Sequence, residues 1–325
     1  MKPEAYEEHP HRVDVVQTHI SFVFLTENFA YKIKKAVNLG FLDFTTLEKR
    51  RFYCQKELLL NKRLCDGMYL DVVPIKKLKS IKVCGQGKVV EYAVKMKRIP
   101  QDRMLNNLLD RNQVDKRLIE RIAKKISGFH TKAETSKTIS DFGSPEVIQK
   151  NWNENFEQSI EFVGKTIQES DFEFIRQRII DFQERNRSLF ERRIKQGKIK
   201  DCHGDIHSGN IFVADKIYIF DAIEFNERFR YSDVASDIAF LAMDLDFKKR
   251  PDLADFLTKK YLKCSSDAGL LDLLSFYKCY RAYIRGKVVS FKLKDKNIGW
   301  QEKETAVKEA EEYFKLAAEY AKTLF

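Results

Sequence analysis

The sequence predicts an α+β protein with a small antiparallel sheet lobe followed by a larger, mainly helical lobe. From about residue 13 to 99, apolar and polar residues mostly alternate, which is the period of a β-strand. From Pro100 onwards apolar residues recur at helical spacing, interrupted by one short β-like island at 202–220. A chain of 325 residues is long enough for two modest domains. We therefore expect one domain over 1–99 and a second over 100–325.

The first lobe is expected to combine short strands with one helix. The polar turn at 26–28 suits a hairpin, and Gly85-Gln86-Gly87 marks a second one between the last two strands. Thr45 and Glu48 fit a capping box, which predicts a helix beginning near residue 46. The predicted strands are 13–16, 20–25, 29–33, 81–84 and 89–96, and residues 70–75 form another short apolar run.

Composition restricts the class of protein. With 43% hydrophobic and 33% charged residues the chain is globular, and no stretch approaches the roughly 20 apolar residues of a membrane-spanning helix. The N-terminal residues lack the apolar core of a secretory signal, and the six cysteines form no C-x-x-C pair. These features exclude a zinc ribbon by spacing and predict a cytoplasmic protein in a reducing compartment, with no membrane partner.

The net charge of +11 is compatible with nucleic acid, an anionic membrane surface or a phosphorylated ligand as partner. The basic residues are spread along the chain, without a basic tail or a nucleic-acid-binding motif. This distribution favours solvated lysine-rich faces and disfavours nucleic acid. The sequence is silent on oligomeric state.

The segment 201–221 carries the most informative chemistry. Asp205 and Asn210 lie five residues apart on a turn, and a hairpin with its tip at 214–216 then leads to Asp221. Because a hairpin folds back, Asn210 at its entry and Asp221 at its exit are expected to come close together. Magnesium takes few protein oxygens and completes its shell with water and phosphate, and a nearby carboxylate can deprotonate a hydroxyl. These are the parts of phosphoryl transfer; an ordinary Asx-rich turn is the alternative.

The same segment resembles the catalytic loop of the aminoglycoside phosphotransferase-like kinases, a superfamily with the protein-kinase-like bilobal fold. Their pattern, H-G-D-x-x-x-x-N followed by a strand and Asp, matches His203-Gly204-Asp205, Asn210 and Asp221. The resemblance implies that Asp205 is the catalytic base, that Asn210 and Asp221 hold Mg²⁺, and that ATP is the donor. The resemblance covers the whole chain, with its motifs in the same order. The chain is similar to a branch of the superfamily that is sometimes fused to a P-loop ATPase domain. No such domain is expected within these residues.

The resemblance makes 1–99 the nucleotide-binding lobe and 100–325 the catalytic and acceptor lobe. Ala30-Tyr31-Lys32 resembles the A-x-K of the kinase lysine strand, so Lys32 would reach the α/β-phosphates, with Lys34 on the same face as its rival. Glu57 fits the position of the acidic partner, unless it is an ordinary surface glutamate. The segment Met96-Lys97-Arg98 would be the hinge, where backbone groups pair with adenine. The turn at 26–28 has no glycine, so no G-x-G-x-x-G phosphate cover is expected.

Three polar residues are expected to support the catalytic loop or its ligand. His203 is interpreted mainly as a packed histidine that fixes the loop through hydrogen bonds. His207 points either toward the acceptor or into the loop. Asp237 lies in a segment that resembles the D-x-A sequence of the family, which braces the catalytic loop by hydrogen bonds.

Three further residues have two interpretations each. Trp152 lies in the helical insertion before the catalytic loop, where the family recognises its acceptor, but its spacing also fits an ordinary core stripe. Arg281 and Arg285 share one helix face. They either bind an anionic acceptor or form a solvated, ion-paired surface, which is the favoured interpretation.

The sequence thus predicts a Mg-ATP-dependent phosphotransferase, a kinase that transfers the γ-phosphoryl group to a hydroxyl of a small molecule. Nothing in it identifies that molecule, and the family name does not license aminoglycosides. One alternative is a catalytically idle nucleotide-binding regulator on the same fold, against which the full set of acidic residues argues. A less favoured alternative is a basic nucleic-acid-binding protein, whose affinity for duplex would fall steeply with salt.

Overall fold

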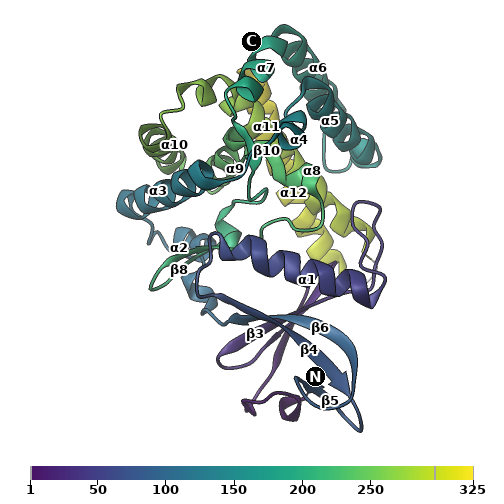
Figure 1. Ribbon diagram of the computed structural model, residues 1–325. Coiled ribbons are helices and arrows are strands. Elements are labelled where there is room, and N and C mark those ends of the chain that lie inside the picture. The colour runs from purple at the N-terminus through teal and green to yellow at the C-terminus, as the bar shows by residue number, and fades with distance from the viewer. Residues whose placement is uncertain (1, 296–297, 325) are drawn as a thin grey trace. The chain divides into compact units, whose positions relative to one another are not determined.

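A computed structural model describes residues 2–295 and 298–324 (Figure 1). The chain forms two compact units, Met1–Asn112 with Gly209–Arg230 and Gln113–Ser208 with Tyr231–Phe325. The first unit therefore holds the predicted first domain, 1–99, together with residues 100–112 and Gly209–Arg230 of the predicted second domain, 100–325. Its Phe212 and Tyr218 pack into the same apolar core as Ala30 and Met96.

The first unit contains a six-stranded antiparallel sheet in the order β1-β2-β3-β6-β4-β5, with helix α1 packed on β4 and β6. A separate two-stranded hairpin, β8–β9, and two short helices complete the unit. The bounds are β1 Asp14–Gln17, β2 Ser21–Leu25, β3 Phe29–Lys34, α1 Leu47–Lys62, β4 Tyr69–Lys77, β5 Ile81–Val83, β6 Lys88–Lys97, α2 Leu105–Asp110, β8 Ile211–Val213, β9 Ile217–Ile219 and α8 Glu227–Arg230.

The pairing of these strands confirms the first predicted hairpin, because β2 and β3 pair antiparallel across the turn at 26–28. The second predicted hairpin is wrong, since β5 and β6 both pair with β4 and lie on its opposite sides. The glycine signal at 85–87 has another cause. Gly87 has φ +110°, and a Cβ there would come within 2.5 Å of the Lys77 carbonyl oxygen. Glycine is needed for this close approach to the end of β4, not for a two-strand turn.

Alternation along β3 separates the two faces of the sheet, as the sequence predicts. Ala30 lies in the core beneath α1, together with Cys54, whereas Tyr31 and Ile33 belong to the core on the other face. The helix itself starts one residue later than the predicted capping box: Thr46, not Thr45, accepts a hydrogen bond from the backbone N–H of Lys49. The Thr45 hydroxyl instead donates to Asp43.

The second unit is mainly helical, as predicted from the periodicity after residue 100. Helix α9 is buried along most of its length and packs against α10 and α11, while α11 also packs along α12 (Figure 1). Among residues 2–295 and 298–324, none of the helices is both long enough and apolar enough to pass through a membrane. The bounds are α3 Lys116–Lys132, α4 Lys137–Asp141, α5 Pro145–Ser159, α6 Glu169–Arg185, α7 Arg187–Lys195, β7 Ile199–Asp201, β10 Tyr231–Asp233, α9 Val234–Phe247, α10 Pro251–Ser265, α11 Leu271–Ser290 and α12 Trp300–Lys322.

A buried arginine fixes the start of α9. The Arg193 guanidinium is 1% exposed and lies 2.6 Å from Asp233, which caps α9, and 2.5 Å from Asp267. We expect Arg193→Met to lower the free energy of unfolding by about 3–5 kcal/mol, because it leaves a buried carboxylate without its partner.

Urea unfolding followed by circular dichroism measures this loss. The matched control is Arg192→Met on the same helix, whose ion pair with Asp272 is more than half exposed on both sides. That variant is expected to lose less than about 1 kcal/mol. Equal losses for the two variants would contradict a stabilising role for the buried pair.

Candidate active site

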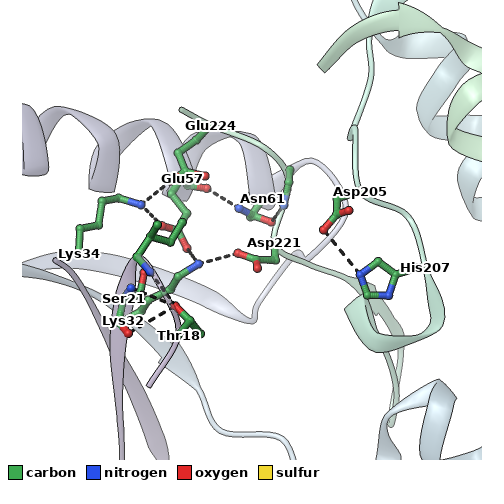
Figure 2. A network of polar contacts seen from close by, with 12 residues as sticks. Thr18, Ser21, Lys32, Lys34, Glu57, Asn61, Asp205, His207, Asp221 and Glu224 are labelled. Carbon is green, nitrogen blue, oxygen red and sulfur yellow. Dashed lines mark hydrogen bonds and ion pairs between the residues drawn. The ribbon is translucent and has the colours of Figure 1, made fainter. Parts of the chain in front are cut away.

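Two lysines of β3 share one buried glutamate of α1 (Figure 2). The Lys32 ammonium lies 2.9 Å from Glu57 Oε1 and 2.5 Å from Asp221 Oδ1. The Lys34 ammonium lies 2.6 Å from Glu57 Oε2. The Glu57 side chain is completely buried, so the alternative of an ordinary surface glutamate is wrong. Lys32 therefore stands between the helix glutamate and the carboxylate that the sequence predicts as a metal ligand.

The charges of this cluster are set by burial and by mutual attraction. Burial favours the neutral form of Lys32, but the carboxylates of Asp221 and Glu57 outweigh it and hold the Lys32 pKa well above its ordinary value. Burial likewise works to raise the pKa of Glu57, but the two ammonium groups prevail and lower that pKa to about 2. At neutral pH, Lys32 is thus a cation and Glu57 an anion, as a phosphate-binding lysine with its orienting partner requires.

The hairpin β8–β9 brings the two predicted metal ligands to one end. Ile211 pairs with Ile219, and the Phe220 N–H donates to the Asn210 carbonyl at 2.9 Å, so Asn210 and Asp221 flank the last rung of the ladder. The Asp221 side chain is 42% exposed and offers oxygen to a cation. An amide and a carboxylate form the hard-oxygen set that Mg²⁺ uses when phosphate and water supply its other ligands, so the residues present fit the ion.

The loop that carries Asp205 belongs to the second unit and is fixed by Asp237. The Asp237 carboxylate accepts hydrogen bonds from the backbone N–H groups of His203 and Gly204, both at 2.9 Å. His203 Nδ1 in turn accepts from the Asp205 N–H at 3.2 Å, so His203 lies packed within the loop. Gly204 has φ +87°, a left-handed conformation that a residue with a Cβ rarely adopts.

The Asp205 carboxylate is accessible and ionised. A third of its side chain is exposed, and its Oδ2 lies 3.6 Å from His207 Nε2 (Figure 2). Burial raises the pKa of Asp205, but His207, Arg285 and His203 outweigh this and lower it to about 2. At neutral pH the group is therefore an acceptor that can orient a hydroxyl.

Asp237 also links the loop to α3. Its Oδ2 lies 3.2 Å from His130 Nε2, while His130 Nδ1 and the Tyr261 hydroxyl form a hydrogen bond of 2.8 Å. A buried cluster consists of Asp237, His130 and Cys202, whose potential ligand atoms all lie within 4.8 Å of one another. Burial holds the Cys202 pKa well above its ordinary value, so without a cation the thiol stays protonated. We assign the cluster to hydrogen bonding of the loop.

The charge of Asp237 gives a pH dependence to stability. Burial raises its pKa, but the hydrogen bond and charge of His130 and the charges of His203 and Arg281 lower it to about 2, below the ordinary 3.8. A depressed carboxyl pKa stabilises the fold above the unfolded-state pKa and loses this effect as pH falls toward the folded-state value. We expect Asp237→Asn to cost about 2 kcal/mol at pH 6 and clearly less at pH 3.

Urea unfolding at the two pH values checks this expectation. Asp255→Asn, at an exposed position of α10, is the control and should show little difference from the parent protein at either pH. If the free energy of unfolding of Asp237→Asn were lower than that of the parent protein by the same amount at pH 6 and at pH 3, the ionised carboxylate would not be the stabilising form.

Arg281 and Arg285 have different environments in the structure, although the sequence predicts the same two interpretations for both. The Arg281 guanidinium donates to the Gly204 carbonyl at 2.9 Å and to the Ser236 hydroxyl at 3.1 Å and is buried. It supports the loop, so its interpretation as a solvated surface residue is wrong. Arg285 lies one helical turn further along α11, over the Tyr313 ring at 5.6 Å.

Trp152 is fully buried in the aromatic core of the second unit. Its ring stacks on Phe156 at 5.3 Å and meets three rings of α11 edge-on. This packing supports the core interpretation of its spacing and leaves no surface for an acceptor. The three rings of α11 are Phe276, Tyr280 and Tyr283.

The predicted hinge has fewer free backbone groups than expected. The Lys97 N–H donates to the Met68 carbonyl and the Arg98 N–H to the Asn28 carbonyl, both at 2.8 Å. Met96 lies within the sheet ladder, paired on both sides. An adenine base could not take the N–H groups of Lys97 and Arg98 without breaking these bonds, so the hinge prediction needs correction for these two donors.

Sequence reasoning missed three residues that the structure places around Asp221 or the loop. Glu224 is buried against Lys34. Asn61 accepts a hydrogen bond from the Ala222 N–H, and its only sequence signal is the four-residue spacing from Glu57 on one helix face. His130 had no sequence signal.

Comparison with known proteins finds sequence relatives in two species of Mycobacterium. No family model matches the chain. Uncharacterized proteins of Mycobacterium tuberculosis and Mycobacterium bovis are each 32% identical to it over 277 residues, which cover 85% of this chain and 54% of theirs. The chain thus spans about half the length of the curated relatives it matches.

Solved structures define the fold. A choline/ethanolamine kinase family protein from Mesorhizobium loti superposes with a TM-score of 0.53 at 10% identity, covering 95% of this chain and 92% of its own. A Plasmodium vivax ethanolamine kinase gives 0.51 at 13%, covering 94% and 81%. A Ralstonia eutropha protein assigned to the aminoglycoside phosphotransferases gives 0.51 at 14%, covering 99% and 96%. The chain has the protein-kinase-like fold of the choline/ethanolamine kinase and aminoglycoside phosphotransferase proteins, which confirms the predicted fold class.

Proposed function

We propose that the chain is a Mg²⁺- and ATP-dependent phosphotransferase that acts on a hydroxyl group of a small molecule. The observation that carries this proposal is the position of Lys32, whose ammonium is held at 2.9 Å by buried Glu57 and at 2.5 Å by Asp221. Binding of a triphosphate with its metal requires an oriented lysine next to side-chain oxygens that can bind the metal. The kinases of the same fold act on small molecules, which supports this acceptor class.

Each residue has one task in the proposed reaction. Lys32 neutralises charge on the α- and β-phosphates, and Asn210 and Asp221 would hold Mg²⁺, which supplies further charge neutralisation when bound. Asp205 accepts the proton of the acceptor hydroxyl. The acceptor oxygen forms the new bond to the γ-phosphorus, the bond from that phosphorus to the β–γ bridging oxygen breaks, and ADP leaves.

Transfer of label from γ-³²P-ATP to fractions of a metabolite extract, with Mg²⁺ present, tests this function. We expect label in at least one small-molecule fraction with the parent protein and about 1000-fold slower labelling with Asp205→Asn. Binding of ATP without transfer to any fraction, and without slow hydrolysis, would favour the idle regulator instead. Absence of nucleotide binding would overturn the proposal.

A further inference from the structure

A second buried ion pair stands beside Lys32 and has no place in the proposed phosphate site. The Lys34 ammonium contacts Glu57 Oε2 at 2.6 Å and also pairs with Glu224 Oε1 (Figure 2). The Lys34 and Glu224 side chains are 1% and 4% exposed. The ammonium also lies 4.9 Å from the centroid of the Phe44 ring. Lys34 is enclosed by protein groups and does not offer its charge to a ligand.

The segment after the predicted metal ligand is held at both ends. Asp221 has φ +65°, a left-handed conformation that is uncommon for a residue with a side chain and persists where its surroundings impose it. Before it, the Phe220 N–H donates to the Asn210 carbonyl, and after it the Ala222 N–H donates to Asn61 Oδ1, both at 2.9 Å. Two residues after Ala222, the Glu224 carboxylate forms an ion pair with Lys34.

Resting on the proposed function, we propose that Lys34, Glu224 and Asn61 are positioning residues that hold Asp221 in the conformation that binds Mg²⁺. Asn61 fixes the backbone directly after Asp221, and the Lys34–Glu224 pair anchors the chain that follows. Glu57 joins this anchor to Lys32, because its two oxygens contact the two lysines. The roles of the lysines are therefore divided: Lys32 serves phosphate, and Lys34 serves the geometry of the metal ligand.

The decisive variant replaces the whole pair, Lys34→Met with Glu224→Leu. Either change alone leaves the buried cluster with an unbalanced charge and is expected to destabilise the protein. The double exchange removes one charge of each sign, and Glu57, which loses Lys34, keeps Lys32 as its partner at 2.9 Å. The measured quantity is the affinity for Mn²⁺ in the presence of ADP, monitored by electron paramagnetic resonance. Thermal unfolding reports stability, and ADP binding in EDTA reports the phosphate site.

We expect the double variant to unfold near the temperature of the parent protein and to bind ADP in EDTA equally well. Its affinity for Mn²⁺ should fall at least tenfold. The matched control is Lys56→Met with Glu227→Gln, an exposed pair at 2.9 Å that joins the same helix to the same segment, and it should leave Mn²⁺ affinity unchanged.

A folded double variant that binds Mn²⁺ like the parent protein would overturn the inference and leave the proposed function intact. If the double variant does not fold, Asn61→Ala decides in its place, with a fivefold or greater loss of Mn²⁺ affinity expected and unchanged affinity overturning the inference. Failure of the parent protein itself to bind Mn²⁺ with ADP would instead remove the proposed function, and the inference with it.

Discussion

Asp205→Asn should lower phosphoryl transfer by about 1000-fold, because a general base of this kind contributes between about 100- and 10,000-fold. The substitution keeps the size of the side chain and the loop hydrogen bonds of Asp237, which are made to the backbone of His203 and Gly204. Binding of nucleotide should therefore stay within about twofold of the parent protein. Turnover of labelled ATP and calorimetric titration with ADP measure the two quantities.

The control is Asp215→Asn at the tip of the β8–β9 hairpin, where the carboxylate accepts a hydrogen bond from the Tyr218 hydroxyl at 2.9 Å. We expect this variant to turn over like the parent protein. If Asp205→Asn kept activity within tenfold of the parent protein, Asp205 would not be the base.

Lys32→Met should lower kcat/KM for ATP by about 100- to 1000-fold, the range for loss of one oriented group that stabilises developing charge. The ammonium is the group that links Glu57 to Asp221, so its loss removes phosphate binding and leaves two carboxylates facing each other. Steady-state kinetics with varied ATP, together with ADP binding in EDTA, measure the effect.

The matched control is Lys95→Met on β6, whose ammonium lies over the Phe29 and Tyr31 rings on the other face of the sheet. This change removes a lysine from the same unit without touching Glu57 or Asp221, and we expect kinetics like those of the parent protein. Equal losses in the two variants would show that a general change of charge, not the position of Lys32, determines activity.

Much of the fold could be predicted from the local sequence pattern. The errors concern features that depend on contacts between residues far apart in the sequence. Alternation places Ala30 and Tyr31 on opposite faces correctly, because the direction of a strand side chain depends only on its neighbours. The hairpin at 85–87 is wrong because the partner of a strand is a tertiary choice, and β4 lies between β5 and β6. A glycine required for close packing carries the same sequence signal as one required for a turn.

The candidate site divides in the same way. The spacing of Asn210 and Asp221 around a hairpin could be predicted, since the hairpin itself brings them to one end. The pairing of Lys34 with Glu224 could not, because they are 190 residues apart and a buried lysine looks like a solvated one in sequence. The hydrogen bond from the Lys97 N–H to the Met68 carbonyl could not be predicted either. Whether a backbone N–H is already bonded depends on the strand or loop that packs beside it.

In the proposed site, Lys32, Glu57 and Asp221 receive a nucleoside triphosphate together with Mg²⁺. Calorimetric titration of the parent protein and of Asp221→Asn with a non-hydrolysable ATP analogue, in Mg²⁺ and in EDTA, tests it most directly. We expect Mg²⁺ to tighten binding of the analogue to the parent protein at least tenfold and to leave its binding to Asp221→Asn nearly unchanged. Binding to the parent protein that is absent, or that is equal with and without Mg²⁺, would contradict it.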